Sequence, residues 1–211
     1  MLQRLVSLAC LPAAVLLLGS CGNSSLALLP KSKIQGIHAG QGIPAPSRQL
    51  VAAATGKPRD KHSMPVYTFS ERHRMVRTTA YTCSEDDHLI YGSKNATGTP
   101  LRYTNRVRSA AADWSFYPVG TTFRIKGLPY LYVIDDYGSA LTGTGTIDLY
   151  KPSKMVMNLW GRRNVEITIV QWGSFNRSAE ILKARTKHPH CAQMLANIIR
   201  QRPDLRRVAM R

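Results

Sequence analysis

Acidic residues are scarce in this chain. Its 211 residues include 12 Asp and Glu against 29 Lys and Arg, which gives a formal net charge of +17. Such a charge permits nucleic acid, anionic lipid or an acidic polymer as a partner. The sequence lacks the mixture of aromatic and basic residues that is typical of RNA- and DNA-binding motifs, so we expect no nucleic-acid partner. A basic composition that serves no partner is the plain alternative.

Histidine and cysteine are also few, with six and four residues. His88 follows three acids, but no second histidine lies at ligand spacing. The trio in His188-Pro189-His190-Cys191 is a weak metal signal by itself. We therefore expect no metal and no cofactor, with His88 in a solvated loop and the trio at the start of a helix.

The first twenty residues predict a secretion signal. Residues 5–18 are apolar, but the run is too short, and too interrupted by Pro12, to span a membrane with confidence. Leu18-Gly19-Ser20-Cys21 then resembles a bacterial lipobox, in which the cysteine is acylated. More than one acyl chain anchors a protein durably. Because Gly22 follows the cysteine, we expect a lipoprotein of the outer membrane that faces the periplasm. A signal peptide with a chance cysteine is the alternative.

Residues 22–64 carry glycine, serine, proline and lysine with scattered small apolar residues, and they show no apolar period of 2 or 3.6. This composition predicts a flexible tether over residues 21–73. We expect one folded domain at 74–174 and a basic helical C-terminal extension at 175–211.

Six segments have the alternation and β-branched content of strands. They are residues 75–82, 107–112, 121–125, 130–134, 146–149 and 165–172. Ser153 predicts the N-cap of a short helix that ends at Gly161. The extension predicts helices at 178–187 and 192–202, separated at His188-Pro189. Six strands with one short helix suit a small closed barrel, which we expect to be a monomer.

Carboxylates gather in the middle of the chain, where eight of the twelve acids lie between Glu85 and Glu166. The strand at 130–134 runs directly into Asp135 and Asp136, and Asp148 lies between two apolar strand residues. Asp is a poor strand former, so this placement indicates a function. Loop chemistry is the alternative. Because neighbouring strand residues point to opposite faces, we expect Asp135 and Asp136 not to share a site.

Four motifs follow one another in a recognisable order: Ala112-Asp113, Pro118-Val119-Gly120-Thr121, Asp136-Tyr137-Gly138-Ser139-Ala140-Leu141 and Ile147-Asp148-Leu149-Tyr150. Over residues 76–173 they resemble the 3D domain, named for three aspartates, of bacterial cell-wall hydrolases. The resemblance includes the barrel of membrane-bound lytic transglycosylase A and, more distantly, rare lipoprotein A. It implies a mainly β fold: a six-stranded double-psi β-barrel with a short helix and a C-terminal helical extension.

The same resemblance implies cleavage of peptidoglycan glycan strands by a lytic transglycosylase-like reaction that forms 1,6-anhydromuramyl ends. It implies Asp136 as the general acid/base, with Asp113 and Asp148 orienting it. Substrate contacts are expected at Thr97, Gly98, Thr99, Tyr137 and Gly138. Tyr137 and Ser139 replace the family's threonine and second glycine. A non-catalytic peptidoglycan-binding or scaffolding lipoprotein on the same barrel is therefore the alternative.

Two cysteines remain for the mature chain once Cys10 leaves with the signal and Cys21 takes the lipid. In an oxidising periplasm, Cys83 and Cys191 predict a disulfide that ties the C-terminal helices to the barrel. A catalytic thiol is the alternative, but it lacks a nearby His-Asn signature.

Overall fold

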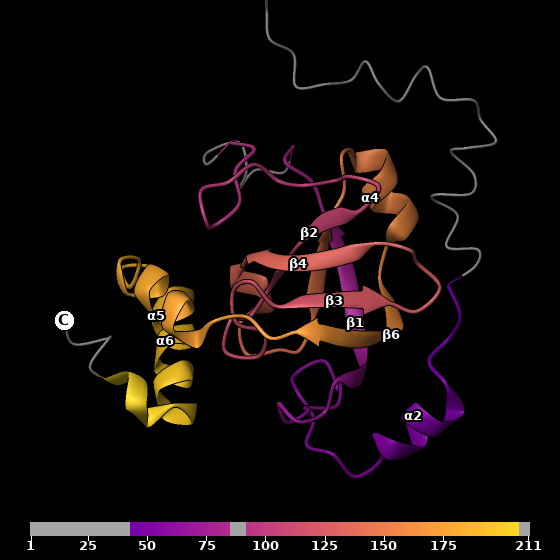
Figure 1. The fold of residues 1–211 in the computed structure, drawn as a ribbon, viewed down its shortest axis with the longest axis horizontal. Helices are drawn as coiled ribbons and strands as arrows, with labels where there is room; N and C mark the ends of the chain where they lie inside the picture. Colours follow the sequence, from indigo (N-terminus) through magenta and orange to yellow (C-terminus); the bar gives the residue numbers. More distant parts are fainter. Residues whose placement is uncertain (1–42, 85–91, 207–211) are drawn as a thin grey trace, which may run out of the picture.

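Six strands dominate the fold, which is a computed structural model that describes residues 43–84 and 92–206 (Figure 1). The strands are β1 (His73–Tyr81), β2 (Val107–Ala112), β3 (Thr122–Ile125), β4 (Leu131–Asp136), β5 (Ile147–Tyr150) and β6 (Arg163–Gln171). Their order is β1-β5-β2-β4-β3-β6, and β6 pairs with β1 to close the ring. The mainly β, six-stranded expectation is confirmed, whereas the double-psi assignment stays a prediction.

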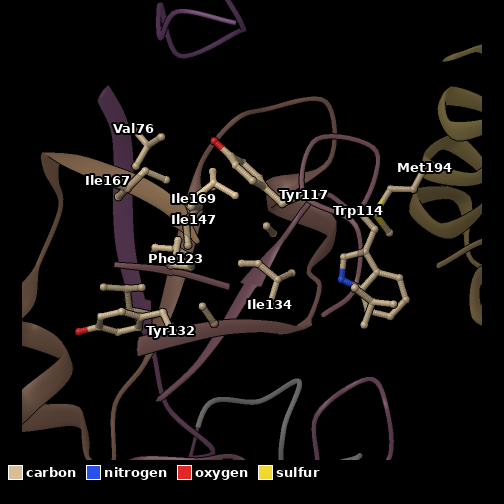
Figure 2. Packing of buried hydrophobic residues seen from close by; sticks show 14 of the residues in the cluster. Val76, Trp114, Tyr117, Phe123, Tyr132, Ile134, Ile147, Ile167, Ile169 and Met194 are labelled. Atoms are coloured by element: carbon tan, nitrogen blue, oxygen red, sulfur yellow. The ribbon is translucent and has the colours of Figure 1, made fainter. Parts of the chain in front are cut away.

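The inner face of the ring holds the main core. Pairing is parallel between β1 and β5 and between β2 and β4, and antiparallel at the other four contacts. Alternate residues of each strand point inward, and Figure 2 shows Val76, Phe123, Ile147 and Ile167 meeting there. Neighbours on the same strands therefore face outward.

Helices lie around this ring: α2 (Arg48–Ala53), α4 (Lys154–Trp160), α5 (Phe175–Lys183) and α6 (Pro189–Gln201), with single 3-10 turns η1 (Ser139–Leu141) and η2 (Pro203–Leu205). The Ser153 hydroxyl accepts a hydrogen bond from the Val156 N–H, and Gly161 has a φ of 59° at the end of α4, as predicted. Pro189 occupies the first turn of α6, where its missing N–H costs no helical hydrogen bond. Among the described helices, none is long and apolar enough to cross a membrane.

Residues 43–73 differ from the expected flexible tether. They carry α2 and bond to the barrel at several points: the Ser47 N–H donates to Glu166 Oε2 (2.9 Å), and the Trp172 indole donates to the Phe69 carbonyl (3.1 Å). Arg74 lies over the Trp172 ring, 4.8 Å from its centroid. A carboxylate on β6 and an aromatic residue directly after it thus fix a segment whose composition alone predicts no structure. Residues 21–42 lie outside the described residues.

The C-terminal helices belong to the core rather than to a separate extension. α6 buries Cys191, Met194 and Ile198, and Met194 lies beside Trp114 in Figure 2. The predicted disulfide was wrong, because both Cys83 and Cys191 are free thiols. Cys191 is enclosed in the core at α6, whereas Cys83 lies next to the Tyr150 hydroxyl, 3.8 Å away.

Gly173 joins the barrel to these helices at a point of very close backbone contact. A Cβ atom at this position would lie 2.1 Å from the Val119 carbonyl oxygen and 2.4 Å from that of Pro118. No side chain fits at such distances, so the connection between β6 and α5 requires glycine.

One end of the barrel holds two buried cations, Arg108 and Lys151, which are 4% and 3% exposed. The Arg108 guanidinium lies 3.3 Å from the Tyr130 ring centroid, and the Lys151 ammonium lies 4.2 Å from that of Trp160. Burial, followed by the charge of Arg108, lowers the pKa of Lys151 to about 7. We call this pair, with its aromatic partners, the cationic end.

Candidate functional site

A row of paired residues crosses four strands on the outer face of the barrel. Thr79 of β1 pairs with Asp148 of β5, Asp148 pairs with Ala111 of β2, and Ala111 pairs with Asp136 of β4. Laterally paired side chains lie on the same face of a sheet. Asp148 and Asp136 therefore face the same side, with Cα atoms about 10 Å apart across two strand spacings. Ala111 is the residue of β2 that pairs with both of them.

A bulge brings a third carboxylate to this face. Ala110 pairs with Ile134 and Ala111 with Asp136, so Asp135 is an extra residue on β4. Such a bulge interrupts the alternation of side chains. The Ser109 hydroxyl, two residues from Ala111 on β2, donates to Asp135 Oδ2 at 2.8 Å. Our expectation that Asp135 and Asp136 do not share a site was wrong for this reason.

Asp136 is held by three donors. The backbone N–H groups of Ala96 and Tyr137 each donate to Oδ1 at 3.0 Å, and the Tyr81 hydroxyl donates to Oδ2 at 3.2 Å. Its side chain is 6% exposed. Hydrogen bonds of this kind favour the ionised form of a carboxylate. Asp136 is thus a buried carboxyl group with both oxygens held by hydrogen-bond donors.

Asp135 has the opposite character. Oδ1 is buried, and among residues 43–84 and 92–206 no group meets hydrogen-bond geometry with it. Burial raises the pKa of Asp135 to about 6; the Ser109 hydrogen bond opposes this rise, and the charge of Asp136 adds to it. Asp135 is therefore about half protonated near pH 6, well above the range where an ordinary aspartate titrates.

Asp148 is the most open of the three. It is half-buried, and the Thr79 hydroxyl donates to its Oδ1 at 2.7 Å. Tyr81 interacts electrostatically with all three aspartates. Its pKa is raised first by burial and then by the charges of Asp136, Asp135 and Asp148. We call Asp135, Asp136, Asp148 and Tyr81 the carboxylate cluster.

Asp113 is located elsewhere. It is fully buried, and its two oxygens accept from the Ser115 N–H and hydroxyl and from the Gly143 N–H, each at 2.7 Å. Burial raises the pKa of Asp113, and these hydrogen bonds oppose the rise. The Asp113 side chain fixes the loop between β4 and β5 through Gly143, so its role at the site is structural.

The residues expected to contact substrate fall into two groups. Thr97, Gly98 and Thr99 form a turn around Asn95, whose side-chain oxygen accepts from the Thr97 and Thr99 N–H groups. Ala96 of the same turn donates to Asp136, so this turn borders the carboxylate cluster.

Tyr137 and Gly138 lead away from the cluster. The Tyr137 ring lies 5.0 Å from that of Trp114, and its hydroxyl accepts from Arg185 at the end of α5. Gly138 precedes η1 with extended backbone angles. Substrate contact at these two positions stays a prediction.

Three partners of the acids were missed by sequence reasoning: Thr79, Tyr81 and Ser109. Thr79 and Tyr81 alternate along β1 and so share a face, which is the one signal available in the sequence. Their link to the acids depends on the β1–β5 register. Among the described residues, no three His, Cys, Asp or Glu side chains are grouped to hold a metal ion. His88 and the acids before it lie outside those residues.

The architecture and this site define a mainly β protein with a cluster of carboxylates on the outer face of the sheet. Residues 108–171 match the family model of the 3D domain, and this match supports the 3D domain family for that segment. The matched residues include Asp113, Asp136 and Asp148, but not β1 or the turn at 95–99. The family is related to peptidoglycan, which is consistent with a cell-wall function. No curated protein matches the chain.

Proposed function

We propose that this protein cleaves peptidoglycan glycan strands by a lytic transglycosylase-like reaction on a double-psi β-barrel of the kind found in membrane-bound lytic transglycosylase A. The observation that carries the proposal is the gathering of Asp135, Asp136 and Asp148 on one outer face, where burial raises the pKa of Asp135 to about 6. The 3D domain match over this segment supports the same substrate class.

The reaction needs a carboxyl group that gives a proton to the glycosidic oxygen. The same group then takes a proton from the muramyl C6 hydroxyl as the 1,6-anhydro ring closes, so no water nucleophile is required. We assign this contact with substrate to Asp148 rather than Asp136, because Asp148 is partly exposed whereas Asp136 is buried and saturated by three donors.

Asp135 and Asp136 support Asp148 without contacting the substrate. Closely spaced carboxylates titrate as a group and hold a proton more readily than an isolated one. The raised pKa of Asp135, about 6, reflects this together with burial. In its ionised form, Asp136 would also stabilise the positive charge that develops on the sugar ring as the bond breaks.

The proposal includes a location for the protein in the cell envelope. Acylation at Cys21 would anchor the chain to the outer membrane on its periplasmic side, and residues 22–42 would connect this anchor to the folded part. Replacing Cys21 with serine should abolish labelling by radioactive palmitate.

Incubation of the purified chain with isolated sacculi tests the activity directly. Release of anhydromuropeptides, identified by mass, is the expected result. Activity should fall as the pH rises through about 6, because the carboxylate cluster then loses its proton. Sedimentation with sacculi without release would instead favour the non-catalytic peptidoglycan-binding function.

A further inference from the structure

A second feature lies on the same outer face, at the opposite side of Thr79 from Tyr81. It is a pocket of about 380 Å³ between β1, the start of β6 and the segment that precedes β1, lined by His62, Met64, Arg77, Arg162, Arg163 and Asn164. No acidic residue lines it. Arg77 and Arg162 have no salt bridge in the described part of the chain. We call this feature the basic pocket.

The carboxylate of Asp60 acts on His62 and offsets part of the positive charge of the basic pocket. Asp60 accepts from the His62 and Met64 N–H groups through Oδ1, at 2.8 and 3.0 Å, and from the Gly145 N–H through Oδ2, at 2.9 Å. Its oxygens are thus directed at backbone donors. Burial and then the charge of Arg77 lower the pKa of His62, whereas the charge of Asp60 raises it. Against this one carboxylate, three arginines line the pocket: Arg77, Arg162 and Arg163. The pocket therefore has a surplus of positive charge.

The strand register places the basic pocket next to the carboxylate cluster. Arg77 and Thr79 are two residues apart on β1, so they share a face at a separation of about 7 Å. Arg77 Nη1 donates to the Thr146 hydroxyl at 3.2 Å, and Thr146 lies two residues before Asp148. A ligand that passes over Asp148 along the strands therefore comes within reach of the arginines.

We propose that the basic pocket binds carboxylate groups of the peptide stems on peptidoglycan, while the attached glycan strand lies across the carboxylate cluster. This inference rests on the proposed function. Guanidinium groups form paired hydrogen bonds with carboxylates, and Arg162 is exposed and available for such contacts. The protein is then selective for peptide-bearing strands over naked strands. The carboxylate cluster repels the stem carboxylates, so the favourable orientation directs the stems away from the cluster and towards the basic pocket.

The test compares binding of labelled soluble strands with and without peptide stems to the full chain at low salt. The stems are removed by an amidase, and Asp148→Asn serves as background so that strands remain intact. Without further changes, we expect the peptide-bearing strands to bind more tightly. The double change Arg77→Gln and Arg162→Gln should weaken their binding by about tenfold, as expected for two partly exposed charge-assisted contacts. Binding of stripped strands should not change, which also verifies folding.

Arg106→Gln is the matched control, because Arg106 is an exposed arginine that does not line the basic pocket. It should leave both affinities unaltered. Equal affinity of the protein for both strand types would overturn the pocket assignment and leave the proposed function intact. Failure to bind either type would overturn the proposed function and this inference with it.

Anionic vesicles distinguish the other source of oxyanions. Should the double variant lose binding to phosphatidylglycerol vesicles but keep its preference for peptide-bearing strands, the pocket serves lipid phosphate and the stem assignment is rejected.

Discussion

The carboxylate cluster and the cationic end are two places where the same strands bury charge, with opposite sign and different support. Asp136 receives three hydrogen-bond donors, and Asp148 stays partly open. At the cationic end, Lys151 is covered by the Trp160 ring, and no acid forms a salt bridge with it in the described residues. One place is arranged for proton exchange, whereas the other holds its charge against aromatic faces.

This difference teaches how buried charge is distributed between function and structure. Both places depart from ordinary protonation, since the pKa of Asp135 is raised to about 6 and that of Lys151 is lowered to about 7. Both departures lower the stability of the folded state at neutral pH. Only the carboxylate cluster combines this cost with a partly exposed member, Asp148, that a ligand can contact. The acids therefore define the reactive site. Substitutions in the carboxylate cluster and at the cationic end can test this comparison.

The largest effect is expected for Asp148→Asn. The amide keeps the hydrogen bond from Thr79 but cannot deliver a proton, so anhydromuropeptide yield should fall by about 10²–10⁴-fold. Circular dichroism and sedimentation with sacculi serve as controls and should match the unsubstituted chain. Full activity of this variant, together with inactivity of Asp136→Asn, would return the acid/base role to Asp136.

Lys151→Met should stabilise the protein at neutral pH. The pKa of Lys151 is lower in the folded than in the unfolded state, so stability rises as pH increases from about 7 towards the ordinary lysine value. Methionine removes this penalty, and we expect a gain of about 1–4 kcal/mol at pH 7, reduced by the lost contact with Trp160. Urea unfolding at pH 7 and pH 10 measures it. A gain that does not shrink at pH 10 would contradict the explanation.

Asp135→Asn should show the reverse pH dependence. Because the folded-state pKa is raised, the ionised side chain costs little below the ordinary aspartate value and costs most above about pH 6. The variant should thus gain about 1–3 kcal/mol at pH 8 and almost nothing at pH 4. Thermal unfolding of both proteins across this range gives the comparison. Equal differences at the two pH values would show that packing, rather than charge, is responsible.

Ser109→Ala should have the smallest effect. The Ser109 hydroxyl stabilises the ionised form of Asp135, so its removal raises the pKa of Asp135 further. The alkaline limb of the activity profile should move upward by a fraction of a pH unit to about one unit. Thr104→Ala, a change to an exposed hydroxyl elsewhere, is the control and should leave the limb in place.

Much of the fold could be predicted from local pattern. β2 begins and ends at the predicted residues, and Ser153 and Gly161 bound α4 as expected, because alternation, capping and glycine geometry act over a few residues. The segment before β1 could not be predicted in this way. Its order comes from partners such as Glu166 on β6 and Trp172 directly after this strand, about one hundred residues away.

The site shows the same limit. The motifs identified Asp136 and Asp148, and the family match supports their segment. Their relation to Asp135 depends on a one-residue register shift, which reverses the inference from simple alternation. Asp113 belongs to the same motif set, yet its oxygens bind Ser115 and Gly143. A spacing of aspartates along the chain therefore does not reveal which of them meet.

Gly173 has a consequence for how genetic data on this protein would look. Any side chain there meets the carbonyl groups of Val119 and Pro118, so a saturating screen for loss of function should reject substitutions at Gly173 as strictly as at a catalytic acid. The two kinds of hit separate by abundance: changes at the joint deplete the protein itself, whereas Asp148→Asn leaves a normal amount of inert protein. A map of intolerant positions needs that second measurement before it locates an active site.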